Sequence, residues 1–529
     1  MAEPISHDVA IIGSGFAGSV LARILNRQGK KVLLLERETH PRFSLGESST
    51  PLAGLCLERL AKRWDLPDLR DLATYGRWMD RLPHLRRGLK RGFTFYDHRV
   101  GEPFRNSGFN EARLMVAASP DDRVADTHWL RADVDLHLVE RARAEGVDYR
   151  DSNRVVGLEI DSDAVTLTVQ PTKAGQPTAA KAQKIRVAFV VDAGGAAGVI
   201  PRLLEIPPRM EMPRIDTGLL FAHFKGVKPF EAVAEGAVVG DGPYPESRAA
   251  VHHILADGWM YQLMFDHGVT SAGLVLRNDR LDLEISAVTQ DPSAAWTHFL
   301  RRYPSLEAQF ADAAPVTRIR YLPRLQYQYS RSAGPRWFLL PHAYAFFDPL
   351  FSVGMAWSLT AVERLADLME NGLESWRSYS LLLNHEADQV RYLIEAAYAG
   401  MDDFELFTAV CLLYFATVSF TEVQQRLSRE EDRSLAWQGF LGARDPVVQS
   451  LLVQARDRLL KRDEDGLENF PDWVRRRIAP RDIAGLASPK ASNLYPVDFG
   501  LLIERSRLLG LEPEEIRAAL PKLRGDLDA

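Results

Sequence analysis

The chain has 529 residues, of which 46% are apolar and 26% charged, with 36 glycines and 30 prolines. This composition is typical of a globular protein of roughly two to four domains and excludes a disordered, collagen-like or coiled-coil chain. The 65 basic and 71 acidic residues leave a net charge of −6, so no overall positive field exists that would hold nucleic acid or an anionic membrane. A small-molecule ligand is therefore the first expectation.

Cysteine use and apolar runs bear on where the protein works. Cys56 and Cys411 are too few for a disulfide framework or a cysteine-rich metal site, which favours a reducing, cytoplasmic compartment. The N-terminal residues contain neither a basic region nor a cleavage site of a signal peptide. Residues 343–362 and 406–420 are apolar, but the first contains Asp348 and Pro349 and the second is short for a membrane span. We expect buried helices and no stable membrane insertion.

Residues 8–36 predict one βαβ unit. Residues 8–12 and 31–35 are strand-like, and residues 19–27 are helix-like. The turn contains Gly13, Gly15 and Gly18, and Glu36 ends the second strand. Such glycines let backbone amides and the helix N-terminus approach a pyrophosphate, while the carboxylate accepts hydrogen bonds from ribose hydroxyls. The unit predicts a dinucleotide site, for which we also consider the neighbouring residues Phe16, Ala17 and Arg37.

The remaining elements follow in chain order. We expect helices over residues 53–63 and 132–145, strands over 92–96, 185–191 and 337–340, a hairpin over 155–169, a strand-rich region over about 203–330 and a helix beginning after Gly354. Residues beyond about 375 are helical and charged in pattern. The fold class is therefore α/β. It comprises a Rossmann-like dinucleotide-binding domain (1–202 with 335–375), an added antiparallel-sheet substrate domain (203–334) and a C-terminal α-helical domain (376–529).

Two further segments resemble the FAD-binding elements of flavoproteins with the para-hydroxybenzoate-hydroxylase fold. They are Arg131-Ala-Asp-Val-Asp135 and Val191-Asp-Ala-Gly-Gly195, in the same order along the chain. The resemblance implies that FAD is the cofactor and that Arg131 and Asp192 contact it. No second strand-turn-helix unit with a GxGxxG turn is evident for a nicotinamide cofactor, so a separate flavin reductase is expected to supply reduced flavin.

Within that superfamily the chain resembles the flavin-dependent halogenases. Gly46-Glu47-Ser48 is similar to their strap between the flavin and substrate pockets, and residues 89–95 are similar to the segment that carries their catalytic lysine, here Lys90. The segment from Phe347 to Gly354 resembles the signature over the isoalloxazine ring and the halide. The resemblance, over about residues 5–375, implies catalytic roles for Lys90, Glu47 and Ser48. It also implies cofactor contacts from Asp348, Pro349, Ser352, Val353 and Gly354.

A different interpretation of Lys90 comes from its surroundings in the sequence. Arg86, Arg87 and Arg91 flank it, and runs of charge commonly mark solvated faces. A buried lysine would instead have a pKa that falls readily, as a functional amine requires. Exposure of Lys90 in the structure therefore distinguishes the two interpretations.

Several residues depart from the halogenase pattern. Trp259-Met-Tyr261 retains only the first tryptophan of the family's W-x-W motif, which leaves hydroxylation, epoxidation or dehydrogenation open. His342 stands where monooxygenases of this fold have an aspartate, and it either contacts the ribitol or caps the end of the strand. Phe351 replaces the glutamate of tryptophan halogenases, which favours a phenol- or pyrrole-type substrate over an indole.

The other residue clusters give weaker indications of function. Residues 266–268 are turn-like, and the His252-His253 pair has no acidic or cysteine neighbour at ligand spacing, so no metal site is expected. Aromatic residues from Phe404 to Phe420 have helical spacing, which favours a core role over a wall of the substrate pocket.

The sequence therefore predicts an FAD-dependent oxidoreductase or monooxygenase that uses reduced flavin and O₂, with chloride or bromide, to halogenate a small electron-rich aromatic or lipophilic molecule. A flavin hydroxylase, epoxidase, dehydrogenase or reductase of the same fold is the first alternative. A flavoprotein that binds FAD or a lipid-like ligand without turnover is the second.

Overall fold

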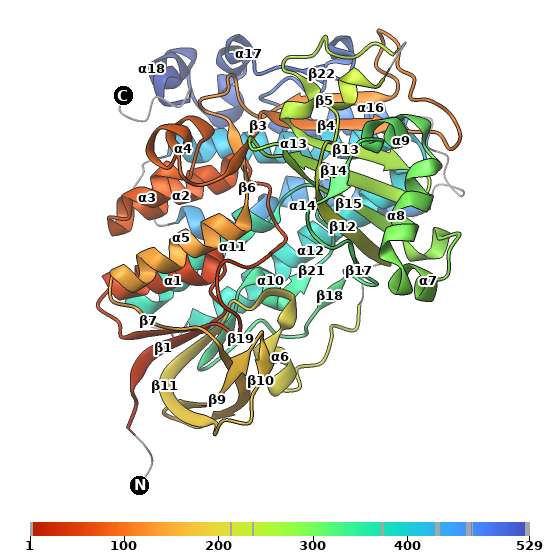
Figure 1. Cartoon of the computed structure of the whole chain (residues 1–529). Coiled ribbons are helices and arrows are strands. Elements are labelled where there is room, and N and C mark those ends of the chain that lie inside the picture. The colour runs from red at the N-terminus through yellow and green to blue at the C-terminus, as the bar shows by residue number, and fades with distance from the viewer. Residues whose placement is uncertain are drawn as a thin grey trace.

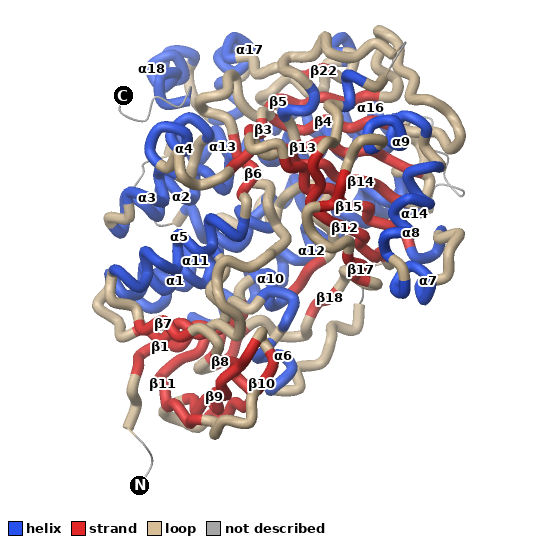
Figure 2. The backbone as a smooth tube through the Cα atoms, viewed as in Figure 1, coloured by secondary structure: helices blue, strands red, loops and turns tan. Residues whose placement is uncertain are grey.

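A computed structural model of the chain describes residues 4–211, 214–234, 237–371, 375–428, 434–461, 467 and 469–523. Two large sheets lie apart in the molecule, with long helices between and beside them (Figure 1). Figure 2 shows the same division, with the strands gathered in two groups and the helices filling the space around them. The α/β fold class is confirmed.

The first sheet contains the predicted βαβ unit. Its strand order is β10-β9-β11-β1-β2-β7, with β20 and β19 continuing from β11 and β8 pairing β9. The strands are β1 (His7–Ile12), β2 (Val32–Leu35), β7 (Asp148–Arg150), β8 (Asn153–Ile160), β9 (Val165–Lys173), β10 (Gln176–Pro177), β11 (Gln183–Asp192), β19 (Ala333–Gly334) and β20 (Trp337–Leu339).

The centre of this sheet is parallel and covered by helices. β1 pairs in parallel with β2 and β11, and β11 with β20. Such strands are buried on both faces and therefore consist of unbroken apolar runs. Helices α1 (Phe16–Arg27), α5 (Arg131–Ala144) and α11 (Gly354–Asn371) pack together beside it. Helix α1 begins three residues earlier than predicted, because the glycine turn leads directly into its first turn.

The second sheet is mostly antiparallel. Its order is β16-β12-β15-β14-β13-β4-β5-β22, and β17 also pairs β12. The strands are β4 (Gly92–Asp97), β5 (Arg113–Ala117), β12 (Thr217–Lys225), β13 (Ala250–Leu255), β14 (Gly258–Met264), β15 (Val269–Arg277), β16 (Ala314–Pro315), β17 (Arg320–Leu322) and β22 (Leu494–Tyr495). One face packs on α8 (Pro292–Arg301) and α9 (Pro304–Phe310), and the other joins the main core.

The second sheet crosses the domain boundaries that the sequence predicts. β4 and β5 were assigned to the first domain, yet β4 pairs β13, and β22 from the C-terminal region pairs β5. β4 is almost wholly buried, so its backbone groups need hydrogen-bonded strands on both edges, and distant segments supply them.

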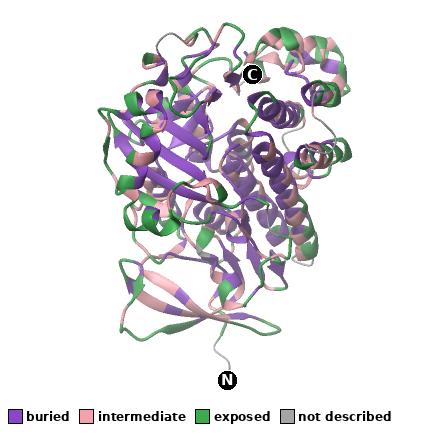
Figure 3. Ribbon diagram, turned by 90° about the vertical axis from the view of Figure 1, so that its right-hand side faces the viewer, coloured by how far each residue is buried: buried purple, intermediate pink, exposed green. Residues whose placement is uncertain are grey.

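Helices from the C-terminal region pack on one another and against α2 (Pro51–Trp64) and the first sheet. They are α12 (Trp376–Gly400), α13 (Phe404–Leu427), α14 (Pro446–Leu460), α16 (Phe470–Ile478), α17 (Phe499–Glu504) and α18 (Pro513–Leu523). Among the described helices, α13 alone is long and apolar enough to cross a membrane, but 72% of its most apolar window is buried inside the protein. Figure 3 shows the same pattern, with buried residues concentrated in the inner helices and the second sheet, whereas outer strands of the first sheet are partly exposed. α13 is therefore packed as a core helix.

The expectation of a helix across residues 343–362 was wrong for its middle. Helix α10 (Pro341–Tyr344) ends at once, β21 (Ala345–Phe346) follows, and α11 begins only at Gly354. Pro349 has no N–H to donate, and Ser352 has a φ of +52°, so residues 347–353 form a loop rather than a helix.

A buried ion pair joins α11 to α12 and generates a stability prediction. Arg364 Nη1 donates to Glu386 Oε2 at 2.7 Å, and both side chains are fully buried. Replacement Glu386→Ala is expected to lower the free energy of unfolding by about 3–5 kcal/mol, because it leaves the Arg364 charge buried and unpaired. Urea denaturation followed by circular dichroism measures this. The matched control is Glu514→Ala, which removes an exposed partner of Arg517 and is expected to leave stability within error of the wild type.

Candidate active site

The glycine turn forms a close cradle at the end of β1. Gly13 has a φ of +102°, and a Cβ on Gly18 would lie 2.0 Å from the Gly13 carbonyl oxygen. Residues with side chains do not fit either position. The helix N-terminus at Phe16 is thereby brought close to the end of the strand, which is the geometry that binds a pyrophosphate.

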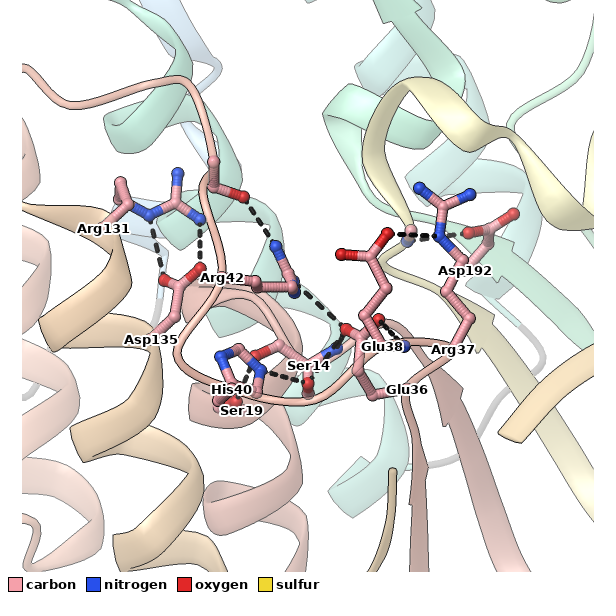
Figure 4. A network of polar contacts seen from close by, with 12 residues as sticks. Ser14, Ser19, Glu36, Arg37, Glu38, His40, Arg42, Arg131, Asp135 and Asp192 are labelled. Atoms are coloured by element: carbon pink, nitrogen blue, oxygen red, sulfur yellow. Dashed lines mark hydrogen bonds and ion pairs between the residues drawn. The ribbon is translucent and has the colours of Figure 1, made fainter. Parts of the chain in front are cut away.

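Glu36 lies beside this turn (Figure 4). Its Oε2 accepts hydrogen bonds from the Ser14 N–H at 3.2 Å, from Ser14 Oγ at 3.0 Å and from Arg42 at 3.1 Å. Burial alone would raise the pKa of Glu36, but the Arg42 charge and the N–H groups of Glu38 and Ser14 outweigh it and lower the pKa. Glu36 is therefore ionised and can accept hydrogen bonds from ribose hydroxyls.

Arg131 connects the cradle to the strap. Its Nε and Nη2 donate to both oxygens of Asp135 at 2.9 Å, and its Nη1 donates to the carbonyls of Leu45 at 2.7 Å and Gly46 at 3.1 Å. The guanidinium lies 4.9 Å from the centre of the Phe16 ring. Phe16 and Arg131 are thus at the cradle, and Ala17 follows in the first turn of α1.

Two polar atoms near Glu36 have no hydrogen-bond partner among the described residues. They are His40 Nδ1 and Arg42 Nε, both buried, and His40 Nε2 lies 2.8 Å from Ser14 Oγ. Buried polar atoms normally have partners, so unpaired ones beside a glycine cradle fit a polar ligand. The residues present therefore fit the dinucleotide part of a flavin cofactor.

Two predicted cofactor residues have other contacts. Asp192 is fully buried; its Oδ1 accepts from the Gly194 N–H at 2.9 Å and its Oδ2 from the Ile200 N–H at 2.7 Å. Burial raises the pKa of Asp192 to about 6 against the effect of these N–H groups. Arg37 is exposed and lies 3.6 Å from Glu38, on the opposite side of Glu36 from Arg42 (Figure 4). The structure does not bring Arg37 together with the cradle.

The loop of residues 347–354 lies between the first sheet and the C-terminal helices. Asp348 Oδ2 accepts from the Tyr398 hydroxyl at 2.7 Å and its Oδ1 from the Leu350 N–H at 3.0 Å, so its carboxylate braces the loop from within. The Ser352 N–H donates to the Pro349 carbonyl at 3.0 Å and closes the turn. Burial raises the pKa of Asp348 to about 7 despite the Tyr398 hydrogen bond.

The His342 side chain lies against the beginning of α11. A Cβ on Gly354 would lie 2.5 Å from His342 Nε2, and Ser358 Oγ is 3.3 Å from Nδ1. Burial, with a smaller effect of the Arg131 charge, lowers the pKa of His342 to about 4. His342 is therefore a neutral imidazole at the beginning of α11, close enough for the Arg131 charge to act on it.

The strap is held as an added strand. Ser48 forms an isolated bridge with His128, the Trp129 N–H donates to the Glu47 carbonyl at 2.6 Å, and the Ser49 N–H donates to the Thr127 carbonyl at 3.0 Å. The Glu47 side chain reaches His223 on β12, with Oε1 2.9 Å from Nε2. The strap is therefore fixed to both the small sheet of β3 (Arg87–Lys90) and β6 (Asp126–Trp129) and the second large sheet.

Lys90 lies in the interior, which excludes the solvated-cation interpretation. The residue is 0% exposed, and Nζ donates to the Ser49 carbonyl at 2.6 Å and lies 4.0 Å from the centre of the Phe93 ring. Burial lowers the pKa of Lys90, and the nearby Asp126 opposes that effect. The predicted strap and lysine segments thus meet at one hydrogen bond.

A cavity opens beside this point. It has a free volume of about 160 Å³ and is lined by Thr50 and α2 (Pro51–Trp64), by β4 and β5, by the loop before α11, and by α13 and residues 483–502. Its walls include Thr50, Phe93, Val353, Tyr414 and Phe415, with Glu422 and Arg426 as charged members. The cavity therefore lies between Phe93, whose ring Lys90 contacts, and the loop that ends at Gly354. Such a mainly apolar cavity with a few polar groups is typical of a small-molecule site.

The minor clusters of the sequence lie in a turn, in a buried strand and on α13. Residues 266–268 form a turn, and His252 and His253 are buried in β13. The described residues contain no group of His, Cys, Asp and Glu side chains suited to a metal ion. The aromatic residues of α13 divide between the core and the wall of the cavity. Phe407 is fully buried, whereas Tyr414 and Phe415 line the cavity.

Comparisons with known proteins agree with this geometry. Residues 11–51 match the model of the NAD(P)-binding Rossmann-like domain. The chain is 29% identical over 419 residues to monodechloroaminopyrrolnitrin halogenase PrnC of Pseudomonas fluorescens, which covers 76% of this chain and 69% of that protein. It is also 29% identical over 401 residues to tetracycline 7-halogenase of Kitasatospora aureofaciens, covering 70% and 68%. The crystal structure of halogenase PltM in complex with phloroglucinol and FAD has a TM-score of 0.80 at 23% identity, over 92% of this chain and 99% of that chain, which shows a shared fold.

The curated relatives, together with the shared fold, support an FAD-dependent oxidoreductase. A pyrophosphate-binding βαβ unit is common to NAD and FAD proteins, so the Rossmann-like match and an FAD cofactor are compatible. The chain is a flavin-dependent halogenase-like enzyme, and its cofactor is FAD.

Sequence reasoning missed the residues that hold the predicted ones in place. Arg42, His223 and Asp126 each contact or face a predicted site residue but belong to no recognised motif. Asp135 ends the segment that begins with Arg131, and its spacing of four residues on a helix is a usable signal for an ion pair. No local signal identifies His223, because its partner Glu47 lies 176 positions away.

The cradle generates a prediction for cofactor binding. Gly18→Ala is expected to abolish FAD binding, because its Cβ would displace the Gly13 carbonyl and open the turn. The visible flavin absorption of the purified variant after incubation with FAD measures this, with circular dichroism as the check on folding. Gly108→Ala is the control, since a Cβ there meets no atom within 4 Å, and it should bind FAD as the wild type does. A yellow, stoichiometrically loaded Gly18→Ala protein would contradict the assignment of the cradle.

Proposed function

We propose that the enzyme halogenates a small, electron-rich aromatic molecule of phenol or pyrrole type, with chloride or bromide as the halide. The observation that carries this proposal is the buried ammonium of Lys90, which lies 4.0 Å from the centre of the Phe93 ring, a wall of an apolar cavity. A lysine that is kept from solvent serves as a hydrogen-bond donor to a reactive species that water would otherwise consume.

The lining of the cavity supports an aromatic substrate. Phe93 and Phe415 have ring centres 5.2 Å apart in an edge-to-face arrangement, and both line the cavity. Tyr414 stacks on Phe351 at 4.6 Å and donates its hydroxyl to the Phe351 carbonyl at 2.9 Å. Such walls bind a flat ring by edge and face contacts. The PltM complex, whose ligand is phloroglucinol, is a phenolic precedent within the same fold.

We assign the FAD contacts as follows. Gly13, Gly15, Gly18 and the amides at Phe16 and Ala17 would bind the diphosphate, with Glu36 at the ribose and Arg131 beside the strap. Pro349, Ser352, Val353 and Gly354 would face the flavin ring, with Asp348 bracing their loop. Asp192 would shape the turn below the cofactor through the N–H groups of Gly194 and Ile200. Arg37, being exposed, would contribute least.

When bound in its reduced form, FAD would supply two electrons and two protons that, with O₂, halide and one further proton, convert an aromatic C–H to C–X and release two waters. Lys90 Nζ would hydrogen-bond the oxygen of the hypohalous acid and polarise the bond to the halogen toward the ring. Glu47 would hold the strap on His223, and Ser48 would keep the strap against β6. The apolar walls would exclude competing water.

The electron source follows from the rest of the proposal. A separate flavin reductase would deliver reduced flavin, because the sequence offers one dinucleotide unit and FAD takes it. We place the enzyme in the cytoplasm, without nucleic-acid partners, in line with its two free and buried cysteines and its net negative charge.

One observation favours a second function, hydroxylation or dehydrogenation on the same fold. Tyr261 stands where the family motif has its second tryptophan, and its ring is packed against Gly273, where a Cβ would lie 2.5 Å from it. If that tryptophan normally keeps substrate away from the flavin, a smaller ring relaxes the separation. The products of the Lys90 variants distinguish the two functions.

Lys90→Met is expected to reduce halogenation at least about 100-fold while leaving FAD binding unchanged, because the apolar side chain fits the site but cannot donate a hydrogen bond. The assay combines the enzyme, FAD, a flavin reductase with NADH, O₂, bromide and a panel of phenols, with products identified by mass spectrometry. Lys184→Met removes an exposed lysine and should match the wild type. Hydroxylated or desaturated products formed equally by wild type and Lys90→Met would instead support the second function.

Val418→Phe tests whether the cavity holds the substrate. Val418 lines the cavity on α13, so the larger ring is expected to raise the KM for a phenol by about tenfold or more, equivalent to about 1.4 kcal/mol, with little change in flavin affinity. Steady-state kinetics with saturating halide measure this. Val447→Phe makes the same change at an exposed position of α14 and should leave KM unaltered. Equal KM values in both variants would place the substrate elsewhere.

A further inference from the structure

Lys90 faces a carboxylate across the small two-stranded sheet. β3 pairs antiparallel to β6, and Lys90 and Asp126 are direct register partners. Directly opposed residues in such a pair extend from the same face of the sheet, with their Cβ atoms about 5 Å apart. Asp126 is 3% exposed and Lys90 is 0% exposed, so both ionisable side chains leave the sheet into the protein interior.

Asp126 lacks a hydrogen-bond partner that would account for its burial. Its Oδ2 has none among the described residues, although a buried carboxylate is costly without a partner or a counter-ion. Glu386 and Asp192, two other fully buried carboxylates, accept hydrogen bonds from Arg364 and from two N–H groups. In the described part of the chain, Glu246 and Asp367 also have one oxygen without a hydrogen-bond partner, but the other oxygen of each accepts from Arg113 or Trp437. The burial of Asp126 therefore calls for a local explanation.

The other charges near Asp126 are already paired. From α13, Glu422 and Arg426 face it, and these two bond to each other at 2.8 Å, while Arg426 also lies 3.8 Å from Glu58 of α2. Tyr414, also on α13, is the neutral group that faces Asp126 from the cavity wall. Lys90 is left as the cation without a carboxylate of its own, because its bond goes to the Ser49 carbonyl.

We propose that Asp126 is the positioning residue for Lys90: its carboxylate is the counter-ion that keeps Lys90 Nζ protonated and directed to the strap end of the cavity. This deepens the proposed function and rests on it. Asp126 acts through Lys90 and does not itself contact the substrate. No bond is made or broken in this role, and the proton stays on Nζ. In this chain the carboxylate comes from β6, whereas position 351, on the loop before α11, holds a phenylalanine.

The titration directions agree with a mutual dependence. Burial lowers the pKa of Lys90 and raises that of Asp126, and each group counteracts the shift of the other by its charge. His128 on β6 and His252 on β13 also face Lys90, but burial lowers the pKa of each to about 3, so both are neutral over the working range. Asp126 is therefore the group whose charge sets the protonation of Lys90.

The test is the pH profile of kcat for bromination between pH 6 and 10. Asp126→Asn removes the charge with nearly the same shape, so the pKa of Lys90 should fall and the alkaline limb should move to lower pH by roughly one unit. Asp126→Glu restores a carboxylate and should keep the limb close to the wild-type position. Asp122→Asn removes a half-exposed carboxylate four residues earlier, which pairs with Arg91 and Arg248, and should not move the limb.

A second readout does not depend on activity. Thermal unfolding of flavin-loaded wild type, Lys90→Met, Asp126→Asn and the double variant forms a double-mutant cycle. We expect the double variant to lose less melting temperature than the sum of the single losses, because each single change leaves one charge buried alone. The excess should depend on pH, since it requires both groups to be ionised. If Asp126→Asn does not fold, Asp126→Ser replaces it, with the same expectations.

The outcomes separate this inference from the proposed function. An alkaline limb that stays in place in Asp126→Asn, together with additive melting losses at every pH, would overturn the role of Asp126 even if Lys90→Met is inactive. Full bromination by Lys90→Met would instead overturn the proposed function, while pH-dependent coupling in the unfolding cycle would still support the pairing of the two side chains. A shifted limb with pH-dependent coupling supports both.

Discussion

The burial of one ammonium group, Lys90 Nζ, is the constraint on which the arrangement of the site depends. A charge without solvent requires nearby oxygen atoms and a counter-charge, since its transfer to a dry interior is unfavourable by several kcal/mol. The strap supplies a carbonyl at Ser49, the Phe93 ring supplies its face, and β6 places Asp126 opposite. Phe93 is three residues from Lys90, but Ser49 and Asp126 come from segments 41 and 36 positions away, so this burial of the lysine requires the Ser49 segment and the β3–β6 pair to come together.

The same requirement explains why the strap is so firmly held. Its backbone is bonded to β6 at Thr127 and Trp129, its first residues accept from Arg131, and Glu47 reaches His223 on the second sheet. Arg131 is in turn locked by Asp135. A movement of the strap would therefore disturb both the cofactor side and the lysine side. The strap couples the two halves of the site through hydrogen bonds rather than through loop packing alone.

The cofactor half of the site could be predicted from the sequence because its signals are local. The glycines from Gly13 to Gly18 and the carboxylate of Glu36 belong to one βαβ unit, and the structure places them as that motif requires. Lys90 was identified only by its resemblance to the halogenase segment, because its arginine neighbours in the sequence indicate a solvent-exposed surface. Asp126 and His223 could not have been found, because strand pairing between remote segments brings them to the site and no spacing in the sequence reports such pairing. The loop of residues 347–353 was misjudged for a related reason: apolar composition does not distinguish a buried loop from a buried helix.

The retained tryptophan of the altered motif has a structural partner that accounts for its presence. Trp259 Nε1 donates to the Tyr398 hydroxyl at 3.0 Å, which donates to Asp348 at 2.7 Å, and Asp348 holds the Leu350 N–H. This chain of bonds joins the second sheet, α12 and the loop before α11. Tyr261 lies beside it, but its hydroxyl takes no part in these bonds. The change at that position therefore leaves intact the frame that sets the loop against the cavity. Under the proposed function, the reaction still depends on the protonated lysine and on the exclusion of water.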